Sequence, residues 1–215
     1  MLVSFEGIDG SGKSLQARRL EAHLRAAGRP TLLVREPGGT AVGEHIRGLV
    51  LGDAALAVDA FAELLLFSAA RAQLVAEVVR PALQAGAVVV CDRFLDSTVA
   101  YQGGGRGVAD VDWLDAFQRR VTGGIVPDRT YLLDVPLDVA HQRRARRADD
   151  RMEAAGPAFF DRVRSAYLAL ADREPGRVVV LDGTRLPEDL HDEIVRDVLT
   201  RLGGAAASRP APLSA

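Results

Sequence analysis

One short motif constrains the fold of this chain more than any other feature: Gly7-Ile8-Asp9-Gly10-Ser11-Gly12-Lys13-Ser14, between an apolar run and a helical pattern. It fits the pattern G-x4-G-K-[ST], in which a glycine-rich loop joins a strand to a helix and its backbone N–H groups hold phosphate oxygens. Lys13 is the only lysine among the 27 lysine and arginine residues. Because a compact ammonium reaches between phosphates where a planar guanidinium does not, this lysine indicates a triphosphate site rather than an ordinary glycine-rich turn.

The rest of the chain alternates short apolar runs with longer helical patterns. We expect strands over residues 2–5, 31–34, 87–91, 130–133 and 178–181, and helices over roughly 13–27, 41–51, 59–84, 110–121, 136–148, 157–172 and 187–202. Apolar strands joined by helices indicate an α/β fold, a five-stranded parallel sheet with helices on both faces. The length suits one domain over 1–202, and the small-residue, proline-rich stretch 203–215 is expected to be a disordered tail.

Composition argues against several classes of protein. A net charge of −2 disfavours nucleic-acid binding, and no apolar run reaches the roughly 18 residues of a membrane span. The N-terminus lacks the features of a secretion signal and Cys91 is the single cysteine, so we expect a cytoplasmic protein without membrane contact. The guanine-reading motif of a GTPase needs a second lysine and the catalytic loop of a protein kinase needs an asparagine, and the chain has neither.

Three later strands run into an aspartate, namely Asp92, Asp134 and Asp182. A carboxylate at the carboxyl end of a parallel strand faces the crevice where ligands bind. Asp92, which Arg93 follows at once, is the best candidate to hold Mg²⁺ together with the hydroxyl of Ser14. Asp134 and Asp182 are more simply explained as turn caps.

The segment from Asp92 to Gln102, which reads D-R-F-L-D-S-T-V-A-Y-Q, closely resembles the thymidylate kinase signature D-R-[FYH]-x-x-S-[TN]-x-A-[YF]-Q. Residues 36–40, E-P-G-G-T, and residues 66–71, L-F-S-A-A-R, are similar to two further fingerprints of that family. The resemblance extends from Phe5 to about Asp182. It implies a P-loop kinase fold, a homodimer, and Mg²⁺-dependent phosphorylation of dTMP to dTDP by ATP, within dTTP biosynthesis.

The resemblance also assigns roles to individual residues. It places Phe67 on the thymine face, Arg71 on thymine O4, Arg93 on the acceptor phosphate, Asp9 on the 3′-hydroxyl and Tyr101 beside the 2′ position of the sugar. The residues expected around dTMP are Asp9, Glu36, Pro37, Phe67, Arg71, Arg93, Ser97, Thr98, Tyr101 and Gln102. Those expected around ATP are Gly7, Ile8, Asp9, Gly10, Ser11, Gly12, Lys13, Ser14, Arg143 and Thr184. Taken alone, Phe67 is also compatible with a core position, and Tyr101 with a buried tyrosine whose hydroxyl is satisfied.

Five arginines fall within nine residues: Arg143, Arg144, Arg146, Arg147 and Arg151. Taken alone, such a cluster is a solvated face or a nucleic-acid patch. The resemblance instead places it in a lid over about 141–156, in the subgroup whose lid supplies arginines that the phosphate loop lacks. Since arginine on a moving γ-phosphate accelerates transfer, Arg147 and Arg151 join Lys13, Asp9 and Arg93 as expected catalytic residues.

The chain departs from the family pattern at three places. Leu15 replaces a second hydroxyl residue after Ser14, Phe94 replaces the commoner tyrosine or histidine, and Gly156-Pro157 is expected to stiffen the lid hinge. Other functions also stay open: a kinase for another nucleotide, an ATP-driven switch that forms no phosphorylated product, or a nucleic-acid-binding protein that uses the arginine cluster.

Overall fold

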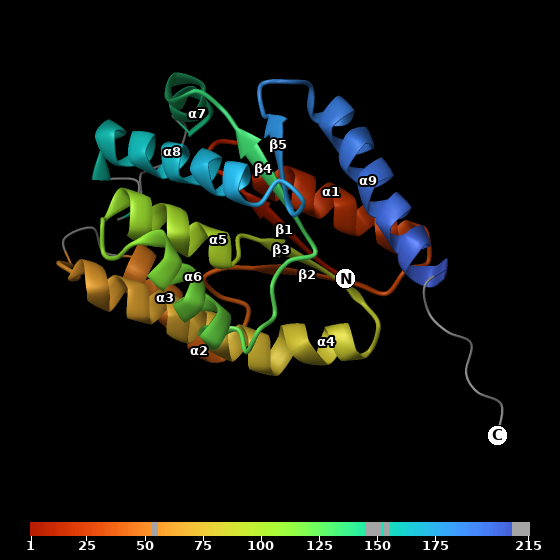
Figure 1. The fold of residues 1–215 in the computed structure, drawn as a ribbon, viewed down its shortest axis with the longest axis horizontal. Coiled ribbons are helices and arrows are strands. Elements are labelled where there is room, and N and C mark those ends of the chain that lie inside the picture. Colours follow the sequence, from red (N-terminus) through yellow and green to blue (C-terminus); the bar gives the residue numbers. More distant parts are fainter. Residues whose placement is uncertain (53–55, 145–151, 153–154, 208–215) are drawn as a thin grey trace.

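The computed structural model describes residues 1–52, 56–144, 152 and 155–207. Within them, five parallel strands form one sheet in the order β2-β3-β1-β4-β5 (Figure 1). The strands are β1 (Leu2–Glu6), β2 (Thr31–Arg35), β3 (Val88–Asp92), β4 (Arg129–Asp134) and β5 (Val178–Asp182). Every predicted strand is present to within one residue at each end, and the predicted α/β fold with a five-stranded parallel sheet is confirmed.

Helices cover both faces of the sheet (Figure 1). On one face lie α1 (Lys13–Ala26) and α9 (Pro187–Ala207), where Leu20, Leu24 and Ile194 pack against Phe5 and Tyr131. Burial of each such aliphatic side chain contributes about 1.5–3 kcal/mol through its removal from water. On the opposite side lie α2 (Ala41–Leu51), α3 (Ala60–Leu74), α4 (Arg80–Gln84), α5 (Leu95–Thr98), α6 (Val111–Val121) and α8 (Pro157–Arg173), while α7 (Leu137–Arg144) follows β4.

Two helices differ in detail from the prediction. The predicted helix over 59–84 contains a π-helical turn, η1 (Val75–Val79), between α3 and α4, and it is capped by the side chain of Asp59. Helix α9 runs to Ala207 and thus takes in the first residues of the predicted tail, because a run of alanines has the highest helix propensity. The remaining tail residues, 208–215, lie outside the described part of the chain.

The segment 95–105 is helical, although the sequence predicted no helix there. It consists of α5 and a longer π-helical stretch, η2 (Val99–Gly105). Three consecutive glycines, 103–105, argue against a helix on propensity alone. In the fold they allow close packing on α8, because a Cβ at Gly104 would overlap Ala166 and a Cβ at Gly105 would overlap Phe159. Tertiary packing therefore outweighs local preference, in a π-helical geometry that is frequent at functional sites.

The pairing of β1 with β3 positions the functional loops. Phe5 is in register with Asp92, so the loops that follow these two strands leave the sheet side by side. This edge is the crevice in which open α/β sheets bind ligands. Among the described residues, no helix combines the length and apolar character needed to cross a membrane.

Candidate active site

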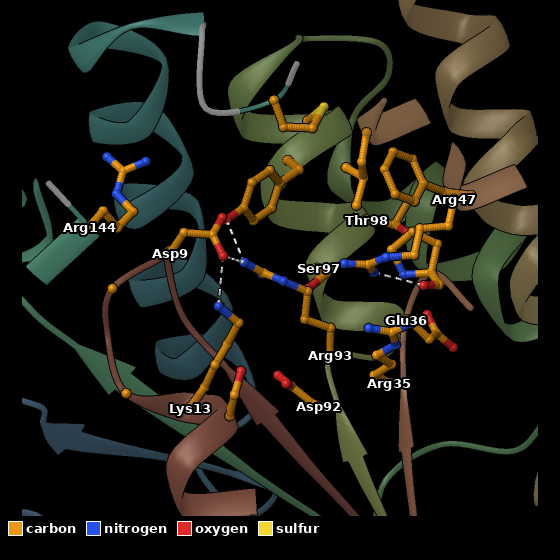
Figure 2. A pocket seen from close by; sticks show the side chains of 18 of the residues that line it. Asp9, Lys13, Arg35, Glu36, Arg47, Asp92, Arg93, Ser97, Thr98 and Arg144 are labelled. Carbon is orange, nitrogen blue, oxygen red and sulfur yellow. Dashed lines mark hydrogen bonds and ion pairs between the residues drawn. The ribbon is translucent and has the colours of Figure 1, made fainter. Parts of the chain in front are cut away.

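A cavity of about 760 Å³ opens above the carboxyl ends of β1 and β3 (Figure 2). It brings together most of the predicted site residues: Asp9, Gly10, Gly12, Lys13, Ser14, Glu36, Pro37, Phe67, Arg71, Asp92, Arg93, Ser97, Thr98, Tyr101, Gln102 and Arg143. Gly7, Ile8 and Ser11 belong to the same loop without lining the cavity, and Thr184 lies away from it. Arg147 and Arg151 lie outside the described residues.

The phosphate loop has the backbone that its glycines predict. Gly7 and Gly10 have φ values of 133° and 90°, and a Cβ on either would overlap the carbonyl oxygen of Leu133 or Ala140. Helix α1 begins at Lys13, and the preceding Gly12 supplies no side-chain cap. The first turn of the helix therefore keeps backbone N–H groups for an anion, at the positive end of the helix dipole.

Asp9 lines the cavity and lies between two cations, Lys13 and Arg93 (Figure 2). Its Oδ1 accepts from Lys13 Nζ at 3.0 Å and from Arg93 Nη2 at 2.8 Å, and its Oδ2 accepts from the hydroxyl of Tyr101 at 3.2 Å. Burial raises the pKa of Asp9, but the charges of Arg93 and Lys13 outweigh burial and hold this pKa well below its usual range. Asp9 is thus a fixed anion that joins the phosphate loop to the loop after β3.

Arg93 has a strained backbone conformation, and its guanidinium donates several hydrogen bonds. It is the one non-glycine residue with positive φ, 73°, in the described part of the chain. Its Nη1 donates to the carbonyl of Gly7 at 3.1 Å and to the hydroxyls of Ser97 at 3.2 Å and Tyr167 at 3.3 Å. A left-handed non-glycine backbone costs about 1–3 kcal/mol and persists only where its surroundings impose it, which is common at functional sites.

Arg71 and Glu36 form a buried pair at the other end of the cavity. Arg71 donates four hydrogen bonds: from Nε to Glu36 Oε2, from Nη1 to the side chains of Thr98 and Gln118, and from Nη2 to the carbonyl of Phe94. Its Nη2 also forms an ion pair with Glu36 Oε2. The second carboxylate oxygen, Glu36 Oε1, is buried and has no hydrogen-bond partner among the described residues. Burial raises the pKa of Glu36, and Arg71 partly offsets this rise. Phe67 lines this same cavity and also packs on the neighbouring core.

Asp92 fits the predicted role at a metal. Its Oδ1 is buried and lacks a hydrogen-bond partner within the described residues, and Ser14 lines the same cavity. No cluster of three or more His, Cys, Asp or Glu side chains suited to a metal occurs in the described ranges. A site with so few protein ligands suits Mg²⁺, because this ion usually keeps several waters and binds the phosphates of the ligand.

The other two strand-end aspartates have structural partners. Asp182 accepts hydrogen bonds from the backbone N–H and the hydroxyl of Thr184, so it caps the turn as we expected. The hydroxyl proton of Thr184 is thereby used within the turn. Asp134 does not cap a turn with its side chain; it forms a double ion pair with Arg164 of α8, at 2.6 and 2.8 Å. This ion pair could not be predicted from the sequence near Asp134, because Arg164 lies 30 positions further along the chain.

The described arginines of the 143–151 cluster face the cavity. Arg143 Nη1 donates to the carbonyl of Gly183 at 2.9 Å and to that of Gly10 at 3.4 Å. Arg144 also lines the cavity, and its guanidinium lies 5.1 Å from the ring centre of Phe160. The contacts of Arg143 thus join the end of α7 to the phosphate loop and to the turn after β5.

Comparison with known proteins identifies the family. A family model described as thymidylate kinase matches residues 5–194. The chain belongs to the thymidylate kinase family. The thymidylate kinase of Chlorobium chlorochromatii is 46% identical over 94% of this chain and 96% of the relative, and that of Deinococcus radiodurans is 48% identical over 90% and 94%. The crystal structure of thymidylate kinase from Ehrlichia chaffeensis matches with a TM-score of 0.74 at 32% identity, over 92% of this chain and 98% of that one.

This membership confirms the family, the kinase activity and the P-loop kinase fold that the signature predicted. The cavity of this thymidylate kinase family member is also lined by residues that were not predicted from the sequence, among them Arg18, Arg35, Arg47 and Met152. Arg35 ends β2 as Asp92 ends β3, so its position at the carboxyl end of a parallel strand was the signal that indicates it. Arg47 Nη1 donates to the carbonyl of Pro37 across a loop, a contact that no local spacing indicates.

Proposed function

We propose that this chain transfers the γ-phosphoryl group of ATP to the phosphate of dTMP, giving ADP and dTDP. The observation that carries the proposal is the position of Asp9 between Lys13 and Arg93, at 3.0 and 2.8 Å from one carboxylate oxygen. Two cations that converge on one point from opposite loops suit a donor and an acceptor phosphate that must meet there. Such transfer requires little from the protein besides positioning and charge stabilisation.

On the donor side, the loop amides and Lys13 hold the β- and γ-phosphates of ATP. Arg143 and the turn around Gly183 lie where the nucleoside of ATP would follow. Ser14 and Asp92 would hold Mg²⁺, which supplies charge neutralisation between the phosphates when it is bound. The unpaired Oδ1 of Asp92 supports this assignment.

On the acceptor side, Arg93 binds the dTMP phosphate and Asp9 accepts from the 3′-hydroxyl. Phe67 stacks on thymine, while Arg71 donates to O4 by sharing or exchanging one of its present partners. Ser97, Thr98 and Gln102 line the same cavity, together with Glu36 and Pro37. A planar, bidentate guanidinium suits phosphate, so Arg93 is the natural anchor for the acceptor.

We further propose that the chain belongs to the subgroup whose lid, about 141–156 within a single domain over 1–202, supplies catalytic arginines. The phosphate loop has Asp9-Gly10-Ser11 and no arginine, so positive charge on the moving γ-phosphate must come from elsewhere. Arg147 and Arg151 are the candidates from sequence. The proposal includes a cytoplasmic location, which accords with the single cysteine, Cys91, buried in β3.

The proposal is tested with the purified chain, ATP, Mg²⁺ and a panel of nucleoside monophosphates. We expect dTDP as product and a kcat/KM for dTMP that exceeds those for UMP and AMP by about a hundredfold or more. Faster phosphorylation of UMP or AMP would make the chain a kinase for another nucleotide. ATP hydrolysis without dTDP would support an ATP-driven switch instead.

Tyr101 should exclude the ribose 2′-hydroxyl. Its ring packs against Phe159, Phe160 and Tyr167 with centroid distances of 6.1–6.5 Å, and its hydroxyl accepts from Arg93 at 2.9 Å. Tyr101→Ala opens this space, so we expect the ratio of kcat/KM for dTMP over the ribonucleotide to fall about tenfold or more. Tyr101→Phe keeps the ring and should retain most of the discrimination. An unchanged ratio in Tyr101→Ala would remove this side chain from the sugar pocket.

We propose that the chain forms a homodimer through a face made by α2, α3 and α6. Most of the large, exposed apolar side chains in the described ranges lie on these helices: Val42, Leu49, Phe61, Leu65 and Trp113. Trp113 stacks on Phe117 at 5.0 Å and lies 6.4 Å from Phe61, so the aromatic residues form one patch. A patch of this kind on a folded domain is typical of a protein interface.

Trp113→Glu should therefore dissociate the dimer. In a two-fold symmetric interface the introduced glutamates of both subunits are buried in the same contact, where the two negative charges disfavour association. We expect sedimentation velocity to detect a monomer for this variant and a dimer for the unmodified chain. The matched control is Leu186→Glu, since Leu186 is 66% exposed in the turn before α9 and lies off this face. Dimers in both variants would exclude the face made by α2, α3 and α6 as the interface.

A further inference from the structure

Glu6 is a buried carboxylate beside the proposed acceptor site, and the reaction described above assigns it no role. It is the last residue of β1, directly before the phosphate loop, and its side chain is completely buried. Burial and the nearby charge of Asp96 raise the pKa of Glu6 to about 7, although Arg93 acts in the opposite direction. A buried carboxylate destabilises the folded state unless hydrogen bonds offset the loss of its hydration.

The hydrogen bonds of Glu6 all lead to the surroundings of Arg93. Oε1 accepts from the backbone N–H of Phe94 at 2.7 Å, the residue directly after the left-handed Arg93. Oε2 accepts from the hydroxyls of Ser97 at 2.6 Å and Tyr167 at 2.7 Å. The carboxylate thus contacts three separate segments: the turn after β3, helix α5 and helix α8.

The two hydroxyls connect Glu6 to the guanidinium. A hydroxyl has one proton, so a hydroxyl that donates to Glu6 turns its lone pairs toward other donors. Arg93 Nη1 is such a donor, at 3.2 Å from Ser97 Oγ and 3.3 Å from the Tyr167 hydroxyl. Ser97 Oγ also lies 2.9 Å from the Tyr167 hydroxyl, a contact in which either atom could donate, and that contact holds no proton when both hydroxyls donate to Glu6. In that arrangement the hydrogen bonds run from Arg93 through each hydroxyl to the carboxylate.

We propose that Glu6 is a positioning residue for acceptor binding: it fixes the Ser97 and Tyr167 hydroxyls as acceptors for Arg93 and holds the turn that gives Arg93 its left-handed backbone. The inference rests on the proposed role of Arg93 in binding the dTMP phosphate. It also gives Ser97, which the resemblance placed around dTMP without a specific contact, a role through Arg93. Glu6 itself touches no reacting atom.

The test is a double-mutant cycle read by equilibrium binding of dTMP and, separately, of ATP by calorimetry. Glu6→Gln keeps the shape, but its amide donates to the hydroxyls and turns their protons toward the guanidinium. We expect the Kd for dTMP to rise about tenfold, with the Kd for ATP changed less than about twofold. In the Arg93→Ala background the same Glu6→Gln change should alter the dTMP Kd by less than about twofold.

Tyr167→Phe is the second variant, since it removes one hydroxyl of the chain without touching the carboxylate. The dTMP Kd should rise about threefold to tenfold in Tyr167→Phe, again with ATP binding unchanged. Tyr131→Phe is its matched control, because Tyr131 is buried with its hydroxyl on Asp197 at 2.7 Å, at the α9 side of the sheet. Circular dichroism and thermal melting establish that each variant is folded.

Each outcome has one meaning. Equal losses from Glu6→Gln in the presence and absence of Arg93 would mean a general structural role and would overturn the inference. Equal losses of dTMP and ATP binding in Glu6→Gln would overturn it as well. If Arg93→Ala alone binds dTMP as tightly as the unmodified chain, the acceptor assignment itself is wrong, and the inference goes with it.

Discussion

Lys13→Arg should lower kcat for dTDP formation by about 10²–10³-fold, although the substitution preserves the positive charge. The Lys13 side chain is only 7% exposed, and Nζ lies within 3.5 Å of the Ile8 carbonyl and 3.0 Å of Asp9. A planar guanidinium in this space would displace the loop whose amides bind the phosphates. Since all other basic positions of the chain except histidine are arginine, the substitution tests directly why this one is not.

The control is Arg25→Lys, an arginine-to-lysine exchange on the same helix, α1. Arg25→Lys lies near the end of α1, where Arg25 is 68% exposed and pairs with Glu21, and kcat should change by less than about twofold. Steady-state rates with saturating ATP and dTMP provide the measurement. A Lys13→Arg variant within a few-fold of the unmodified kcat would show that the site needs only charge at this position.

Arg93→Ala should weaken dTMP binding far more than ATP binding. Loss of one partner from a desolvated charge pair costs about 2–5 kcal/mol, which corresponds to a rise in the dTMP Kd of about thirtyfold or more. The Kd for ATP should rise much less, because Lys13 and the loop amides stay in place and Asp9 keeps its ion pair with Lys13. Calorimetric titration with each ligand separately measures both effects.

Arg196→Ala controls for the loss of an arginine as such. Arg196 is exposed on α9, on the face of the sheet away from α3 and α8, and its removal should leave both dissociation constants unchanged. Equal weakening of dTMP and ATP by Arg93→Ala would mean that Arg93 supports the whole site rather than the acceptor.

The strands and most helices of this fold could be predicted from sequence because their apolar periodicity is local. The phosphate loop was equally predictable, since its glycines are required by backbone geometry and close approach at Gly7 and Gly10. The helix over 95–105 was not predictable in this way. Its glycines disfavour a helix locally, and they are explained only by packing of Gly104 and Gly105 on α8, about sixty residues further along the chain.

The residues of the candidate site could be predicted, but their connections could not. The motifs placed Asp9, Lys13 and Arg93 in one cavity, yet nothing in them indicated that a single oxygen of Asp9 binds both cations. Glu6 and Tyr167 were missed because they lie 161 positions apart and meet only in the folded chain. A charged residue at the end of a fully buried strand was the one signal that pointed to Glu6.

The most direct measurement is a crystal structure of the chain with dTMP and a non-hydrolysable ATP analogue. The proposed function predicts the dTMP phosphate on the guanidinium of Arg93, the γ-phosphate on Lys13, and Asp9 beside the 3′-hydroxyl between them. Thymine should lie against Phe67, with O4 toward Arg71. An acceptor phosphate bound away from Arg93, or the ATP analogue on the Arg93 side of Asp9, would contradict the assignment of donor and acceptor sites.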